Sequence, residues 1–193
     1  EYPLQAIYRT SCINNLKNLN SWKKPEDFSL GLNSKDSEVA AAHKDLQIFN
    51  QEDIRKLKVG FKNSHIISRN YSEAFQDLFV LTALDGKLNG KYVEIGAGYP
   101  FYGNNTFLLE SEFEWEGVSL DIHKEFVERH TQDRKNPALL LDARYLEYEK
   151  LFIELGYGTD LDYLQLDTDP PSVTYEVLTK IPFTKYRFAV ITY

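Results

Sequence analysis

The chain has 193 residues, of which 42% are hydrophobic and 26% charged, a composition typical of one globular domain with an appendage. Its formal net charge of −7 makes the surface acidic, and an acidic surface repels the phosphate backbone of nucleic acids. No apolar run approaches the roughly 20 residues that a membrane-spanning helix requires. We therefore expect neither nucleic acid nor a membrane as a partner.

The N-terminal sequence indicates a cytoplasmic protein. It lacks the basic start and the continuous apolar segment of a secretory signal peptide. The single cysteine, Cys12, has no second cysteine with which to form an internal disulfide, as is usual in a reducing compartment.

Residues 1–70 alternate polar clusters with short helix-like segments. Segment 37–49 has the apolar spacing of an amphipathic helix, and segment 50–57 begins with Asn50, a good N-cap residue, followed by acidic residues. No motif of enzyme chemistry occurs in this region. We therefore expect a helical N-terminal extension over residues 1–70 and a separate domain over residues 71–193.

A longer helix is predicted at the start of that domain. Ser72 is placed to cap it, and Gly86 or Gly90 is placed to end it, since glycine commonly follows the last helical residue. The apolar residues of its predicted buried face are Phe75, Leu78, Phe79, Leu81 and Leu84.

From residue 91 onward, short apolar runs alternate with segments long enough for two or three helical turns. The runs are rich in Val, Ile, Leu and Tyr, as strands covered on both faces are. This alternation predicts an α/β fold, with a parallel, Rossmann-like sheet and helices on both faces. The predicted strands are 91–96, 117–122, 138–143, 162–167 and 186–193.

Four of the five predicted strands carry an acidic residue at or near the carboxyl end. Open α/β sheets bind ligands just outside the carboxyl ends of their strands, so we expect these side chains along one edge of the sheet. They are Glu94, Asp121, Asp142 and Asp167.

The turn after the first strand, within the sequence VEIGAGYPFYGNN, has three interpretations. Gly96 and Gly98 suit a tight strand-to-helix turn with no ligand at all. They also match the first two glycines of a dinucleotide fingerprint, but Phe101 occupies the third position, where a small residue is needed. An acid followed by G-x-G is also the pattern of an S-adenosylmethionine turn, which needs no third glycine because no pyrophosphate approaches the helix.

Charge favours the third interpretation. S-adenosylmethionine carries a sulfonium and an ammonium group, which Glu94 would attract, whereas the same carboxylate would repel a pyrophosphate. Asp121, at the end of the second strand, is placed to accept the ribose hydroxyls. Asp142, at the end of the third, is placed to accept the adenine amino group.

Four stretches of residues 71–193 carry a resemblance to a known family. In chain order they are FQDLFVL, YVEIGAGYPFYGNNTFLLE, WEGVSLDI and DYLQLDTDPPSVTYEVL. Together they resemble the FkbM-type class I methyltransferases, which implies S-adenosylmethionine as cofactor and methylation of a hydroxyl on a small molecule or carbohydrate. The cofactor contacts so implied, with the residues beside them, are Gln76, Glu94, Gly96, Ala97, Gly98, Asn105, Asp121, Ile122, Asp142 and Ala143.

The fourth predicted strand ends in the residues expected to face the acceptor. The resemblance implies a place for Asp167 between cofactor and acceptor, and either Asp167 or Asp169 is expected to accept the hydroxyl proton. Pro170 and Pro171 follow, where the family usually has glycine. A class I methyltransferase sheet has two further strands after the fifth, so either they lie outside this sequence or the sheet has five strands.

Asp160, Asp162, Asp167 and Asp169 offer alternating carboxylates for Mg²⁺, but same-face neighbours on a strand lie about 6 to 7 Å apart, and we expect no metal. A non-catalytic Rossmann-like module of a larger protein is the alternative to an enzyme. An NAD-linked oxidoreductase is disfavoured by Phe101.

Overall fold

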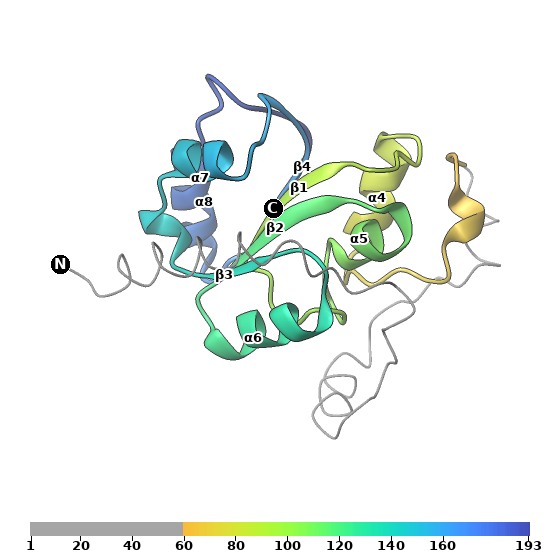
Figure 1. Cartoon of the computed structure of the whole chain (residues 1–193), viewed down its shortest axis with the longest axis horizontal. Coiled ribbons are helices and arrows are strands. Elements are labelled where there is room, and N and C mark those ends of the chain that lie inside the picture. Colours follow the sequence, from red (N-terminus) through yellow and green to blue (C-terminus); the bar gives the residue numbers. More distant parts are fainter. Residues whose placement is uncertain (1–59) are drawn as a thin grey trace.

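A five-stranded sheet organises residues 60–193, the part of the chain that the computed structural model describes (Figure 1). The strands are β1 Lys91–Ile95, β2 Glu116–Asp121, β3 Ala138–Leu140, β4 Asp160–Leu166 and β5 Arg187–Thr192. They lie in the order β3-β2-β1-β4-β5, and every neighbouring pair is parallel. The chain runs outward from β1 to β3 and then crosses back to β4, which is the Rossmann-like α/β topology that the sequence predicts.

Helices cover both faces of this sheet, as predicted. They are α4 Gln76–Ala83, α5 Phe107–Phe113, α6 Lys124–Asp133, α7 Tyr148–Glu154 and α8 Pro171–Lys180, with 3₁₀ turns η2 Ser64–Ile66 and η3 Ala143–Tyr145. Figure 1 shows α4 and α5 on one face of the sheet and α7 and α8 on the other. The remaining helix, α6, packs along β2 and β3.

Alternating side chains along β1 build a separate core on each face. Tyr92 is fully buried with Leu81 of α4 and Leu108 of α5, whereas Val93 and Ile95 are fully buried on the side of α7 and α8. Each large apolar side chain that is fully buried contributes about 1.5–3 kcal/mol. Burial on both faces is the reason that the strands read as continuous apolar runs rather than as alternating ones.

The first helix of the domain begins later than predicted. Ser72 lies four residues before the helix, but its hydroxyl oxygen still accepts the Asp77 N–H of the first turn at 3.3 Å, and the hydroxyl donates to Asp77 Oδ1 at 2.5 Å. Phe75 then adopts a left-handed backbone conformation, with φ of 61°, immediately before the helix starts at Gln76. A left-handed phenylalanine is rare, so nothing in the residue pattern indicates this delayed start.

The end of the same helix is as predicted, but its face is not. Gly86 has a φ of 64°, and its N–H donates to the Leu81 carbonyl at 2.8 Å, as expected for the glycine that follows a helix. The predicted buried residue Phe79 is 57% exposed, whereas its neighbour Val80 is fully buried, so the buried face of α4 is not the one that the sequence indicates.

Residues 60–70, at the end of the predicted helical extension, contain no α-helix, and their one helical turn is the 3₁₀ turn η2. Phe61 and Ile67 are buried in the core beside α4 and α5, so this segment packs as part of the domain. The helices predicted at 37–49 and 50–57 lie outside the described residues. Between residues 60 and 193, no helix has the length and apolar character needed to cross a membrane.

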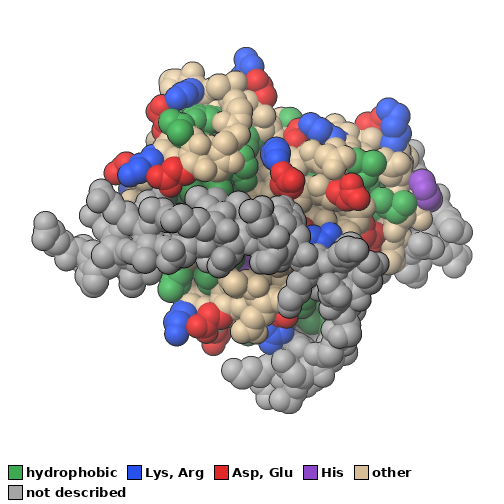
Figure 2. All heavy atoms as spheres, viewed as in Figure 1, with side chains coloured by type: hydrophobic (Ala, Val, Ile, Leu, Met, Phe, Trp, Pro, Cys, Tyr) green, Lys and Arg blue, Asp and Glu red, His purple; other side chains and the backbone are tan. Residues whose placement is uncertain are grey.

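Charged side chains of both signs are interspersed on the face shown in Figure 2. Exposed ion pairs such as Lys180–Glu176, at 2.7 Å, contribute at most about 1 kcal/mol each because water screens them. The stability of the fold therefore comes from the two cores and from the buried polar network described below.

Candidate functional site

A pocket of about 230 Å³ opens at the carboxyl edge of the sheet, where β1 and β4 end. The strand order reverses between these two strands, and such switch points are where open α/β sheets bind ligands. The pocket brings together eight of the predicted site residues: Gln76, Glu94, Gly96, Ala97, Gly98, Asn105, Asp167 and Asp169. Its other lining residues, which are not among the predicted site residues, are Glu73, Tyr99, Tyr102 and Gly103.

The glycine turn after β1 forms one wall of the pocket. Gly96 has a φ of 78°, and a Cβ atom there would lie 1.8 Å from the Asp167 carbonyl oxygen. Only glycine therefore lets the turn approach the residue after β4 so closely. Gly98 also has a positive φ, of 58°, but a Cβ atom there would meet nothing within 4 Å. The conformation, and not the space, favours glycine at this second position.

The N–H groups of the turn are already occupied. Those of Gly96 and Ala97 both donate to the Leu120 carbonyl, at 2.9 and 3.1 Å. That of Gly98 donates to Asp121 Oδ2 at 2.9 Å. A phosphate-binding turn points its free N–H groups at the ligand, and these three point back at β2. The turn is therefore not arranged to hold a pyrophosphate.

His130, in the last turn of α6, contacts the same turn through the backbone of Gly98. Because a carbonyl oxygen can only accept, Nε2 of His130 carries the proton that it shares with the Gly98 carbonyl at 3.1 Å. A positive charge here would suit the helix dipole. However, burial and the nearby charge of Arg134 lower the pKa of His130 well below its usual value, so the ring is neutral.

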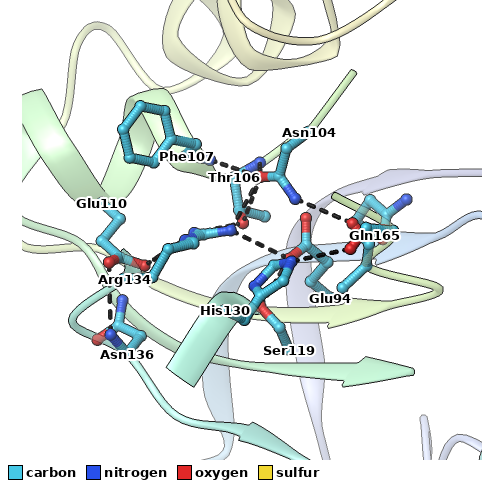
Figure 3. A network of polar contacts seen from close by, with 12 residues as sticks. Glu94, Asn104, Thr106, Phe107, Glu110, Ser119, His130, Arg134, Asn136 and Gln165 are labelled. Atoms are coloured by element: carbon cyan, nitrogen blue, oxygen red, sulfur yellow. Dashed lines mark hydrogen bonds and ion pairs between the residues drawn. The ribbon is translucent and has the colours of Figure 1, made fainter. Parts of the chain in front are cut away.

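Glu94 forms the floor of the pocket and is almost completely buried. Its Oε2 accepts a hydrogen bond from the Ser119 hydroxyl at 2.6 Å and lies 3.6 Å from Nη1 of Arg134 (Figure 3). Burial raises the pKa of Glu94, while the guanidinium of Arg134 opposes that shift. Ser119 and Arg134 thus fix the position of the Glu94 carboxylate in the lining of the pocket.

Arg134 connects Glu94 to a second buried carboxylate. It donates to Glu110 Oε2 from Nε at 3.1 Å and from Nη2 at 2.8 Å. Further bonds go to Asn104 Oδ1 at 3.0 Å and Thr106 Oγ1 at 2.9 Å (Figure 3). Burial opposes the charge of Arg134, but the two carboxylates raise its pKa above the usual value. One guanidinium between two carboxylates leaves this triad with one net negative charge.

The mouth of the pocket is also acidic. Glu73, Asp167 and Asp169 line it, and among the described residues no Lys, Arg or His side chain does so. Partial burial, and then the charges of Asp169 and Glu73, raise the pKa of Asp167. Within residues 60–193 no three His, Cys, Asp or Glu side chains converge closely enough to hold a metal ion.

Asn105 adds an unsatisfied group to the pocket wall. Its side chain is 5% exposed, and its Oδ1 has no hydrogen-bond partner among the described residues. A buried acceptor without a donor costs about 1–3 kcal/mol, which a ligand with an N–H or O–H group would recover.

Four predicted cofactor residues do not line the pocket. Asp121 uses its two oxygens for the N–H groups of Gly98, at 2.9 Å, and His123, at 2.7 Å. Ile122, next to it, is 58% exposed at the same sheet edge. The position of Asp121 as a partner of the turn, rather than as an open ligand contact, is a correction to the prediction.

Asp142 and Ala143 depart further from the prediction. Asp142 Oδ2 pairs with Nη2 of Arg144 at 2.6 Å, and hydrogen bonds from that side chain lower the pKa of Asp142. Its carboxylate is therefore ion-paired instead of open to an adenine amino group. Ala143 is buried in the core beside α7 and α8. The prediction fails because β3 ends early, at Leu140, and the chain turns into η3.

A second, larger hollow lies away from the sheet edge. It is a shallow groove of about 600 Å³ over α7 and the end of α8, lined by side chains of both charges, including Lys150, Glu154 and Lys180. None of the predicted site residues lines it. The acidic pocket at the switch point is therefore the candidate site.

None of the protein-family models and none of the curated proteins compared with the chain matches it. Solved structures that match include the crystal structure of PH0851, with a TM-score of 0.39 and 13% sequence identity. The match covers 82% of this chain and 42% of that one, so the chain spans less than half the length of this structural neighbour. The assignment of an α/β, Rossmann-like fold agrees with the strand order described above.

Proposed function

We propose that residues 71–193 bind S-adenosylmethionine and methylate a hydroxyl group of a small molecule or carbohydrate, as in the FkbM-type methyltransferases that the motifs resemble. One observation carries this proposal: the pocket beside the glycine turn is lined by carboxylates and, among the described residues, by no basic side chain. A ligand with a sulfonium and an ammonium group suits such a site, whereas a dinucleotide phosphate does not.

The cofactor would lie along the turn. Glu94 would attract its ammonium group, and the free Oδ1 of Asn105 would accept from the same group. The exposed side chain of Ile122 offers an apolar surface to the adenine ring. Asp142 takes no part, because Arg144 occupies its carboxylate.

When bound, S-adenosylmethionine supplies an electrophilic methyl group for in-line transfer to oxygen. The residues of the chain would bind and orient the acceptor at the pocket mouth, and such positioning can lower a barrier by about 7–11 kcal/mol. Asp167 is the proposed acceptor of the hydroxyl proton, because its raised pKa makes it a stronger base than an ordinary aspartate. Asp169, two residues further on at the same mouth, would hold the acceptor.

Isothermal titration calorimetry on the full chain tests the binding step. We expect one site for S-adenosylmethionine and for S-adenosylhomocysteine, and no binding of NAD⁺. Glu94→Gln should weaken S-adenosylmethionine binding about tenfold or more, since hydrogen bonds to charged groups contribute about 1.5–3 kcal/mol. Glu154→Gln removes the same charge from an exposed position on α7 and serves as the matched control.

Two results would contradict the proposal. One is the absence of binding by either nucleoside; the other is an equal loss of affinity in the Glu94 and Glu154 variants. Binding without methyl transfer, over a broad panel of hydroxyl compounds, would instead identify a non-catalytic binding module.

We further propose that the reaction takes place in the cytoplasm. The single cysteine of the sequence, Cys12, is the observation that supports this location. Fractionation of cells that produce the chain, followed by immunodetection, tests it, and recovery from an extracellular or membrane fraction would contradict it.

A further inference from the structure

One loop, residues 97–105, supplies half of the pocket lining. It contributes six of the twelve lining residues, and it runs from the glycine turn to the start of α5. No helix or strand of the fold lies within it. The shape of this wall therefore depends on individual hydrogen bonds and not on a helix or a sheet.

Asn104 joins the two ends of this loop. Its Nδ2 donates to the Ala97 carbonyl, seven positions earlier in the chain, at 3.1 Å. Its Oδ1 accepts the N–H groups of Thr106 and Phe107, at 3.0 and 2.8 Å, so the same amide also fixes the start of α5 (Figure 3). The side chain is 1% exposed, and burial shields these bonds from water.

The partners of Asn104 require an amide at this position. Arg134 Nη1 and the Thr106 hydroxyl also donate to its Oδ1, at 3.0 and 3.3 Å. Four donors thus meet the oxygen, and the Ala97 carbonyl, an acceptor, meets the nitrogen. An aspartate could accept these bonds but could not donate to Ala97, and an apolar side chain could do neither.

The elements to which Asn104 is bound are held by the core. Leu108, Leu109 and Phe113 of α5 are fully buried, so that helix has a fixed place against the sheet. Asn104 therefore carries the position of α5 over to the glycine turn. The next residue, Asn105, lines the pocket with its unpartnered Oδ1, so Asn104 also sets the place of that group.

We propose that Asn104 is a positioning residue for the cofactor: by closing the loop of residues 97–105, it holds the pocket wall in its binding shape before the ligand arrives. This inference rests on the proposed methyltransferase function for the identity of the ligand. A preformed wall avoids the entropy cost of ordering a loop on binding, so its loss should weaken affinity. Asn104 does not line the pocket, so its loss should raise KM for S-adenosylmethionine and change kcat less than about threefold.

Calorimetric titration of the full chain with S-adenosylhomocysteine tests the inference. In Asn104→Ser, the hydroxyl can still accept N–H groups at the start of α5 but is too short to reach the Ala97 carbonyl. We expect this variant to bind about tenfold more weakly or worse, because the wall must then be ordered by the ligand.

The matched control is Asn136→Ser. Asn136 is also buried, at 5% exposed, and its Nδ2 donates to the Tyr92 hydroxyl at 3.2 Å and to the Trp115 carbonyl at 2.9 Å. It belongs to the same polar network but does not line the pocket or contact the loop of residues 97–105. The control should lose resistance to urea, as Asn104→Ser does, yet keep its affinity within about twofold.

A second variant, Asn104→Asp, separates the two roles of the side chain. It keeps the acceptor for α5 and Arg134 and removes only the donor to Ala97. S-adenosylhomocysteine has no net charge, so the added carboxylate exerts little net attraction or repulsion on it. This variant should resist urea better than Asn104→Ser, and it should still bind at least about fivefold more weakly than wild type.

Hydrogen exchange of the ligand-free chain gives a readout that needs no cofactor. The N–H groups of Ala97 and Gly98 are bonded to the Leu120 carbonyl and to Asp121, so they should exchange slowly in wild type. In both Asn104 variants they should exchange at least about tenfold faster, and in Asn136→Ser they should not.

Unchanged affinity in both Asn104 variants, an equal loss of affinity in Asn136→Ser, or unchanged exchange at Ala97 and Gly98 overturns the inference. If wild type itself does not bind S-adenosylhomocysteine, the proposed function fails. The exchange rates then still decide whether Asn104 holds the wall, so the two failures are distinguishable.

Discussion

Replacing Arg134 with glutamine tests how the charge of the pocket is held. The guanidinium lies 2.8 Å from Glu110 and 3.6 Å from Glu94, and all three side chains are at least 97% buried. Removing it leaves two buried carboxylates without a cation. Breaking a buried ion pair from one side typically costs about 3–5 kcal/mol, against total stabilities of about 5–15 kcal/mol. We expect Arg134→Gln to lose stability within that range.

Urea denaturation, followed by circular dichroism, measures the loss. The matched control is Arg187→Gln, because Arg187 also pairs with a carboxylate, Asp160, at 2.7 Å. Those two side chains are 75% and 65% exposed, so water screens their attraction and the control should lose far less stability than Arg134→Gln. If Arg134→Gln is too unstable to purify, Arg134→Lys keeps the charge, loses the forked hydrogen bonds, and should lie between the two.

The pH dependence of the deficit gives a second readout. Burial raises the pKa of Glu94, and the guanidinium opposes this, so the variant should raise that pKa further. The folded variant then binds a proton at a higher pH than the unfolded chain does, and its deficit relative to wild type should shrink as the pH falls. A loss below about 1 kcal/mol, or a deficit that grows on acidification, would refute the electrostatic reasoning.

Three further predictions concern the turn and the pocket mouth. Gly96→Ala should lower the free energy of unfolding, measured by urea denaturation, by at least about 2 kcal/mol, because φ is positive there and the new Cβ would lie 1.8 Å from a carbonyl oxygen. The control Gly158→Ala has open space around it and should change that free energy by less than about 0.5 kcal/mol. His130→Gln can still donate to the Gly98 carbonyl but cannot titrate. Burial lowers the pKa of His130 in the folded chain, so the unfolded chain binds a proton first as the pH falls below about 6.5. Wild type should therefore lose stability relative to this variant over that range. Urea denaturation of both proteins at pH 7 and pH 5 measures the difference. Asp167→Asn should lower kcat about 10²–10⁴-fold and leave calorimetric cofactor binding intact. In wild type, activity should fall as the pH drops through the raised pKa of Asp167, and a pH–rate profile that keeps this acidic limb in the variant would contradict the assignment.

The strands were predictable from the sequence because burial on both faces leaves a local signal. Tyr92 and Val93 face opposite cores, so both are apolar in a run that no exposed strand would show. The start of α4 was not predictable, because it depends on the bond from Ser72 to Asp77 and on the left-handed Phe75. Both are consequences of tertiary packing, which residue spacing does not encode.

The turn itself was visible in the sequence, and its supports were not. Two glycines after an acid mark a strand-to-helix turn within a few residues. Arg134 instead reaches Glu110 across 24 positions and Tyr92 across 42 positions, and nothing in its local sequence distinguishes it from an exposed arginine. His130 likewise reaches Gly98 across 32 positions. Long-range partners of this kind appear only once the sheet order is known.

The four acidic residues at the strand ends share a position in the fold but differ in their partners. All four lie at the carboxyl edge, yet each meets a different partner: Glu94 a buried guanidinium, Asp121 two backbone N–H groups, Asp142 a neighbouring arginine, and Asp167 other carboxylates. A carboxylate already satisfied by fixed donors gains little from a ligand, because binding only exchanges one partner for another. Glu94 shares the single guanidinium of Arg134 with Glu110, and Asp167 lies near other carboxylates, so these are the two acids whose free energy a cationic ligand would lower most. A negative charge that fixed partners do not neutralise, and not the position at the sheet edge, therefore distinguishes Glu94 and Asp167, the acids to which we assign roles in binding and catalysis.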